Sequence, residues 1–152
     1  MLIGREKEQY ILRQALQADR SRFVAVYGRR RVGKTFLIRE TFDYTFTFQH
    51  SGLAKGNYRA QLNAFAESLK DAGAFNVTAP KNWMDAFRQL KALIRTSKDD
   101  RKVIFIDELS WMDTPRSDLL MALENFWNGF ASARKDILLI ICSSATSWIL
   151  KT

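Results

Sequence analysis

The sequence contains Gly28-Arg29-Arg30-Arg31-Val32-Gly33-Lys34-Thr35, and this stretch decides how the rest of the chain is interpreted. It matches the pattern G-x-x-x-x-G-K-[ST] at every defined position. The glycines let the backbone turn tightly enough for successive N–H groups to point at phosphate oxygens. The side chain of Lys34 can bridge the β- and γ-phosphates of a nucleotide, and the hydroxyl of Thr35 can bind Mg²⁺. The stretch therefore predicts a phosphate-binding loop.

The residues on either side place this stretch between a strand and a helix, where such a loop has to lie. A compact apolar run, Arg22-Phe-Val-Ala-Val-Tyr27, has the composition of a buried strand. From Lys34 to about Thr41 we expect a helix, whose N-terminus adds the positive end of its dipole. Nucleotide contacts are expected from Gly28, Arg29, Arg30, Arg31, Val32, Gly33, Lys34, Thr35 and Phe36. The three arginines fill variable positions of the pattern, and a solvated basic loop explains them equally well.

A second group of candidate residues follows another apolar segment, Val103-Ile-Phe-Ile106, which ends in Asp107 and Glu108. In an open α/β sheet the strands deliver such residues to the carboxyl edge, where ligands bind. Asp107 is expected to bind Mg²⁺ together with Thr35. Glu108 is expected to polarise the attacking water, so that Glu108 and Lys34 are the catalytic candidates.

The residues after Asp107 also indicate which nucleotide is bound. A Ras-like GTPase would have Asp-x-x-Gly at this position, whereas this sequence reads Asp107-Glu-Leu-Ser110. An Asn-Lys-x-Asp motif for reading guanine does not occur in the sequence either. The sequence therefore favours ATP over GTP.

The rest of the chain alternates between apolar strands and amphipathic helices. Further strands are expected at 44–49, 103–106 and 137–142. Helices are expected at 2–18 and 57–72, after an N-cap at Asn82, and from Thr114-Pro115 onward. Continuous apolar strands between helices predict an α/β fold, a three-layer α/β/α sandwich around a mostly parallel sheet. The length of 152 residues suits a single domain, 1–152.

Charge and composition narrow the partners. Residues 1–40 contain ten Lys or Arg against four Asp or Glu, which is +6 of the total net charge of +8. An anionic partner is expected there, and charge alone does not separate nucleotide phosphates from a nucleic-acid backbone.

The longest apolar runs have about six residues, far short of the roughly 20 that span a bilayer. With a charged N-terminus and one cysteine, Cys142, a cytoplasmic protein without membrane contact is expected.

With the two nucleotide motifs in place, the sequence resembles the prokaryotic AAA-type ATPases of the archaeal-ATPase group, which are related to the STAND ATPases. Leu2-Ile-Gly4-Arg5-Glu-Lys-Glu8 resembles the family's hydrophobic-Gly-Arg-x-x-Glu element, so that Gly4 and Arg5 would lie near adenine. The segment 140–146 resembles the strand that carries the sensor-1 residue, with Ser144 as the candidate and Ser143 next to it. The resemblance implies a strand order of 5-1-4-3-2.

The resemblance also implies what this chain lacks and what it does. Because the sequence ends at Thr152, the fifth strand, the helical lid and any C-terminal domains are expected to be missing. No arginine finger is assigned, since in AAA relatives it commonly lies beyond this point. Arg116 and Arg134 are available, but surface helix ends explain them equally well. Gln49 and His50 fall at the end of the second strand, where the superfamily often places a polar residue that restrains the catalytic Glu. A lone His is ordinarily a surface or satisfied histidine.

The function implied by the resemblance is hydrolysis of ATP, with Mg²⁺ as cofactor, coupled to conformational change in a larger protein. The isolated chain is expected to be weakly active. Homo-oligomers are a candidate assembly, and DNA is a candidate partner through the basic N-terminal quarter or a missing C-terminal domain. Two alternatives stay open: a nucleotide-dependent binding module with little turnover, and a small-molecule kinase, against which the absence of an Arg-rich lid counts.

Overall fold

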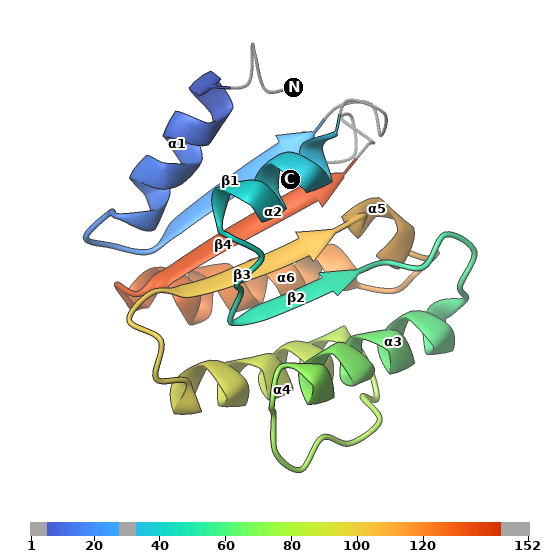
Figure 1. Cartoon of the computed structure of the whole chain (residues 1–152). Coiled ribbons are helices and arrows are strands. Elements are labelled where there is room, and N and C mark those ends of the chain that lie inside the picture. The colour runs from blue at the N-terminus through green and yellow to red at the C-terminus, as the bar shows by residue number, and fades with distance from the viewer. Residues whose placement is uncertain (1–5, 28–32, 144–152) are drawn as a thin grey trace.

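In the computed structural model, residues 6–27 and 33–143 are described, and they contain one four-stranded parallel sheet (Figure 1). The strands are β1 (Arg22–Tyr27), β2 (Phe48–Ser51), β3 (Lys102–Asp107) and β4 (Ile137–Ser143). Their order is β1-β4-β3-β2, and all three pairings are parallel. This confirms the α/β class and the 1-4-3-2 part of the expected order. Parallel pairing brings the carboxyl ends of all four strands to one edge of the sheet.

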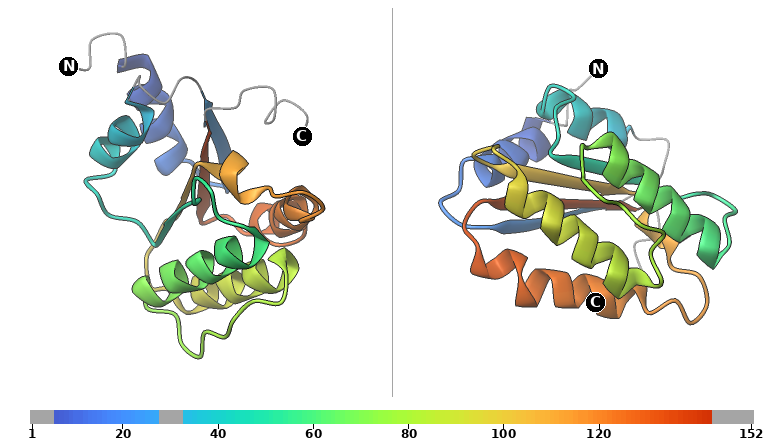
Figure 2. Two further views of the ribbon diagram at one scale, coloured as in Figure 1. Left: turned by 90° about the vertical axis from the view of Figure 1, so that its right-hand side faces the viewer. Right: turned by 90° about the horizontal axis from the view of Figure 1, so that it is seen from below.

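Helices cover both faces of this sheet, as Figure 2 shows. One face carries α1 (Glu6–Leu16) and α2 (Lys34–Thr41), whose buried side chains form a cluster with Phe105 and Ile140. The other face carries the longer helices α3 (Tyr58–Asp71), α4 (Trp83–Thr96) and α6 (Leu119–Gly129). Two short elements complete the order, α5 (Leu109–Met112) and the 3-10 turn η2 (Ala131–Ala133).

The central strands are apolar between their ends, at residues 103–106 and 137–142, because both of their faces are covered. Every residue of β3 and of β4 is buried. Side chains alternate between the two faces along β3, with Phe105 in the α1–α2 cluster and Ile104 and Ile106 in the larger cluster below α3, α4 and α6. Cys142 is a buried free thiol, and burial raises its pKa.

Two asparagines begin the helices that follow β2. Asn57 accepts a hydrogen bond from the backbone N–H of Ala60 at 2.9 Å, and α3 starts at the next residue. Asn82 accepts one from Asp85 at 2.8 Å in the same way, and α4 starts at Trp83. The expected N-cap at Asn82 is therefore confirmed.

Two expected boundaries are wrong. The helix expected from Thr114-Pro115 starts only at Leu119, because Ser117 donates a hydrogen bond to Asp113 at 2.8 Å and closes a turn there. The strand expected at 44–49 is β2, which starts at Phe48. Asp43 and Tyr44 have φ angles of 54° and 57°, so the aromatic and Thr-rich residues before β2 form a turn.

None of the helices within the described residues is long and apolar enough to cross a membrane.

Candidate nucleotide site

The two nucleotide motifs meet through one hydrogen bond. The Thr35 hydroxyl, in the first turn of α2, donates to Oδ2 of Asp107 at the end of β3, at 2.7 Å. These residues lie 72 positions apart in the sequence. The meeting follows from the sheet order, because β1 leads into α2 on the face where the side chain of Asp107 points. A hydroxyl and a carboxylate facing one another supply two of the oxygen ligands that Mg²⁺ prefers.

Three charged side chains at this edge are buried. Lys34 is 3% exposed, Asp107 6% and Glu108 7%. Lys, Asp and Glu are rarely buried unless they are paired or bind a ligand, because leaving water costs a charged group free energy. One positive and two negative groups, held out of water at the sheet edge, form a site suited to a triphosphate and its cation.

The backbone at Glu108 adopts an unusual conformation. Its φ of 51° and ψ of 47° are left-handed, which costs a residue other than glycine roughly 1–3 kcal/mol and is concentrated at functional sites. The N–H of Glu108 donates to Oδ1 of Asp107 at 2.8 Å, and its carbonyl accepts from Trp111 at 3.1 Å. The two oxygens of Asp107 therefore hold Thr35 on one side and the Glu108 peptide on the other.

The start of α2 fits the expected phosphate-binding geometry. Gly33, the N-cap of α2, has a φ of 74°, in the region that favours glycine, and no side chain caps the helix. The N-terminal N–H groups of α2 thus point toward the edge where Lys34 and Asp107 are buried. Phe36 is 51% exposed on the outer side of the same turn.

Several predicted site residues lie outside the described residues, namely Gly4, Arg5, Gly28, Arg29, Arg30, Arg31, Val32 and Ser144. Of the predicted set, the structure brings together Gly33, Lys34, Thr35, Asp107 and Glu108. Ser143, the neighbour of the sensor-1 candidate, is fully buried at the carboxyl end of β4 and pairs with Tyr27 of β1.

His50 belongs to the core next to the site. Its Nδ1 lies 2.8 Å from the hydroxyl of Ser68 on α3, and its ring packs edge-on against Phe65 at 5.1 Å. Burial lowers the pKa of His50 to about 4, so the ring is neutral at pH 7. These contacts fit the structural interpretation of His50. Gln49 and His50 both line a cavity of about 130 Å³ that also reaches Asp107 and Arg39.

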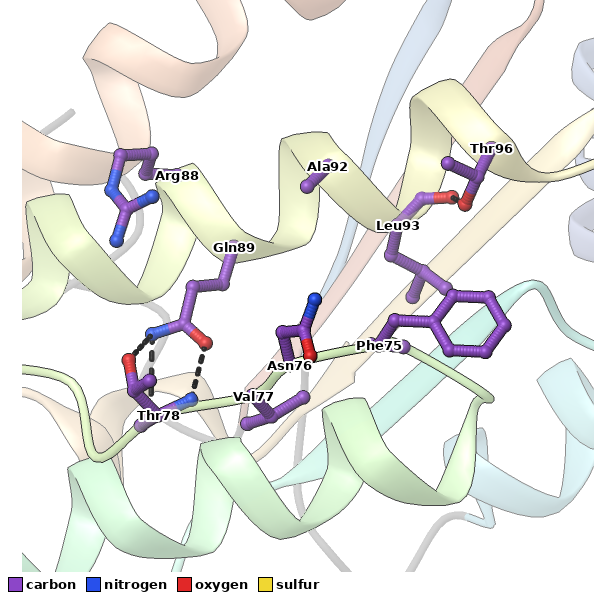
Figure 3. A pocket seen from close by; sticks show the side chains of 10 residues that line it. Phe75, Asn76, Val77, Thr78, Arg88, Gln89, Ala92, Leu93 and Thr96 are labelled. Carbon is purple, nitrogen blue, oxygen red and sulfur yellow. Dashed lines mark hydrogen bonds between the residues drawn. The ribbon is translucent and has the colours of Figure 1, made fainter.

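A larger cavity lies elsewhere. It has a volume of about 400 Å³ and is lined by residues 74–78 of the α3–α4 loop and by one face of α4 (Figure 3). None of its lining residues belongs to the nucleotide motifs.

One residue at the site, Gly52, is absent from the residues predicted from the sequence. Its N–H donates to the Asp107 carbonyl at 3.0 Å. A Cβ atom on Gly52 would lie 2.5 Å from the carbonyl oxygen of Glu108, so only glycine fits there. The pair Gly52 and Gly56 after a strand was the available signal.

Comparisons with known proteins agree with this geometry. A family model described as an ATPase domain predominantly from Archaea matches residues 2–152. Among solved structures, the Walker-type ATPase of Pyrococcus abyssi is similar, with 16% identity and a TM-score of 0.60 over 92% of this chain and 45% of that one. The Aeropyrum pernix ORC2 protein, in ADPNP–ADP complexes, has 17% identity and a TM-score of 0.60, over 97% of this chain and 42% of that one.

A third similar structure is Drosophila ORC bound to AT-rich DNA and Cdc6, with 12% identity and a TM-score of 0.58, over 96% of this chain and 47% of that one. At these identities the structures show a shared fold, and this chain spans less than half the length of each. No curated protein matches the sequence. The family match, which covers nearly the whole chain, shows that it belongs to the P-loop ATPase domains found predominantly in Archaea.

Proposed function

We propose that this domain binds Mg-ATP at the carboxyl edge of its sheet and hydrolyses it, and that nucleotide state is coupled to conformational change in a larger protein. The observation that carries the proposal is the 2.7 Å hydrogen bond between Thr35 and Asp107. It joins the phosphate-loop helix to the carboxylate strand, as a shared nucleotide site requires.

The proposed roles follow from position. Lys34, at the start of α2, would neutralise the β- and γ-phosphates, and the backbone N–H groups at the N-terminus of α2 would bind their oxygens. Thr35 and Asp107 would hold Mg²⁺, which shields the phosphate charge when bound. Among the described residues no group of three His, Cys, Asp or Glu side chains could hold a metal ion. Two protein ligands suit Mg²⁺, because it usually keeps several waters and takes phosphate oxygens.

Glu108 is the proposed base. In hydrolysis a water oxygen attacks the γ-phosphorus, and the bond from that phosphorus to the bridging oxygen of ADP breaks. The Glu108 carboxylate orients the water and accepts its proton, which leaves ADP and inorganic phosphate. The Glu108 peptide is tied to Asp107 by the 2.8 Å hydrogen bond, so base and metal ligand are fixed relative to one another.

Thermal unfolding with and without Mg-ATP tests nucleotide binding. A ligand that binds only the folded chain raises the melting temperature, by an amount set by its concentration relative to Kd. We expect this rise for the wild type and its loss in Lys34→Ala. An equal rise in both proteins, or none in the wild type, contradicts the proposal.

The alternative is a binding module that uses ATP as a switch with little turnover. A carboxylate at Glu108, directly after Asp107, supports hydrolysis, because it can accept a proton from the attacking water. Replacing Glu108 with Gln separates the two, since an ATPase loses turnover while a switch keeps its behaviour.

A DNA partner for the larger protein is also proposed. It is supported by the +6 charge of residues 1–40 and by the DNA in the Drosophila ORC structures. DNA affinity that falls steeply with salt would support it, and salt-independent affinity would count against it.

A further inference from the structure

The segment that links β2 to α3 packs directly against the turn that carries Glu108. Gly52 contacts the Glu108 carbonyl so closely that an added Cβ would lie 2.5 Å from that oxygen and 3.0 Å from the side chain of Met112. The closest atom belongs to the backbone, so no side-chain rotation can make room. Any residue larger than glycine must push the two backbones apart.

A buried glutamine on α3 holds this segment in place. Gln61 is fully buried. Its Oε1 accepts from the N–H of Leu53 at 3.0 Å, and its Nε2 donates to the carbonyls of Leu53 at 2.8 Å and Gly56 at 3.0 Å. One side chain therefore satisfies three main-chain groups of the loop. Gly56 allows this, because a Cβ there would lie 2.8 Å from Nε2.

The Glu108 peptide is thus held from three directions. Its N–H donates to the Asp107 carboxylate, and its carbonyl accepts from the N–H of Trp111 in α5. Gly52 packs against the same carbonyl oxygen. A left-handed residue persists only when its surroundings fix it, and these contacts supply that constraint at Glu108.

We propose that Gly52 is a positioning residue for Glu108, and that Gln61 acts through it by fixing the loop on α3. The inference rests on the proposed role of Glu108 as the base. A Cβ on Gly52 would meet the Glu108 carbonyl and the side chains of Met112 and Trp111 first. The displacement therefore falls on the Glu108 backbone and its carboxylate rather than on Lys34 and Thr35 of α2. Binding of Mg-ATP and turnover should therefore respond differently.

The first test compares two glycine substitutions in the full chain, Gly52→Ala and Gly129→Ala. A Cβ on Gly129 meets only the side-chain nitrogen of Asn125, at 3.9 Å, so it is a matched control. We expect Gly52→Ala to lower kcat by about 10- to 100-fold while the Kd for Mg-ATP stays within about twofold, since displacement of about 1 Å has such an effect. In ¹⁵N spectra the amides of Glu108 and Trp111 should shift in Gly52→Ala and stay unchanged in Gly129→Ala.

The second test compares two glutamines. Gln89 on α4 holds Thr78 of the α3–α4 loop, as Figure 3 shows, with hydrogen bonds of 3.1 Å to the backbone N–H and the carbonyl. We expect Gln61→Leu to lower kcat by about 10-fold and to shift the Glu108 amide, and Gln89→Leu to do neither. This pair also covers the case in which Gly52→Ala fails to fold.

Unchanged Glu108 and Trp111 amides in both Gly52→Ala and Gln61→Leu would overturn the inference. So would shifted amides with wild-type kcat, or an equal loss of kcat in Gln89→Leu. Failure of the proposed function shows up separately, as a wild type that neither binds nor hydrolyses Mg-ATP. In that case the amide shifts alone decide whether Gly52 and Gln61 set the position of Glu108.

Discussion

Two loops on the same face of the sheet are each held by a glutamine side chain, but they contact different parts of the molecule. Gln61 on α3 holds residues 53–56, and Gln89 on α4 holds Thr78, each through both ends of a buried amide. The first loop continues into Gly52 and presses on the Glu108 turn. The second borders the open cavity of about 400 Å³. We therefore expect Gln61 to affect turnover through the contact of its loop with the Glu108 turn, and Gln89 to have no such effect.

The largest effect should come from the residue that the first loop positions. We expect Glu108→Gln to lower kcat by about 10²- to 10⁴-fold, because the amide cannot accept the proton from water. Affinity for Mg-ATP should be retained, as measured by titration with a fluorescent ATP analogue. This loss of kcat is the upper limit for the loss expected from Gln61→Leu. A Gln61→Leu defect larger than that of Glu108→Gln would show that the loop does more than position the base.

Lowering the pH should destabilise the loop held by Gln61 before the loop held by Gln89. The pKa of His50 is lowered from 6.5 to about 4 by burial, so the unfolded chain binds a proton at higher pH than the folded one. Stability is therefore unaffected above about pH 6.5 and falls as pH drops toward 4, by on the order of 3 kcal/mol. Denaturant unfolding between pH 7 and 4 measures this, and His50→Phe should flatten the profile.

Since His50 contacts Ser68 of α3, the loss should appear first around α3. Hydrogen exchange at low pH should rise in residues 50–56 before it rises at Thr78. Equal acceleration in both loops would contradict this assignment.

Coupling energies sharpen the comparison further. The two substitutions Gly52→Ala and Gln61→Leu each change the activation free energy calculated from kcat. Their combined effect should differ from the sum of the two by about 0.5–3 kcal/mol, because both act on one loop. Gly52→Ala combined with Gln89→Leu should be additive to within about 0.5 kcal/mol. A double-mutant cycle under saturating Mg-ATP measures both. Equal coupling in the two pairs would mean that the loops are not independent.

The smallest effects should come from the caps of the two helices. Asn57 begins the helix of Gln61, and Asn82 begins the helix of Gln89. Replacing either with Ala should cost about 1 kcal/mol of unfolding free energy. Only Asn57→Ala should also reduce kcat, by a few-fold at most, because its cap adjoins the loop at Gly56. A reduction of kcat by Asn82→Ala would contradict the expectation that only the cap of α3 affects turnover.

Sequence patterns predicted the local elements well. Strands β1, β3 and β4 and the Asn82 cap are short-range features, fixed by runs of apolar residues or by a side chain that bonds three positions away. The wrong start at Thr114-Pro115 shows where such reasoning stops. The pattern there is typical of a helix start, yet the Ser117–Asp113 hydrogen bond favours a turn.

The sequence by itself determined the α/β class and the residue types of the candidate nucleotide site, Gly33-Lys34-Thr35 and Asp107-Glu108, because apolar strand patterns and the chemistry of side chains are local properties of the sequence. Thr35 and Asp107 were expected to share Mg²⁺, but only the tertiary structure showed that they form a direct hydrogen bond. Only the tertiary structure showed that Gly52 must be glycine and that Gln61 holds its loop. Those contacts join segments up to 72 residues apart or depend on a backbone approach of 2.5 Å. The packing of helices on the sheet creates them, and no local pattern encodes them.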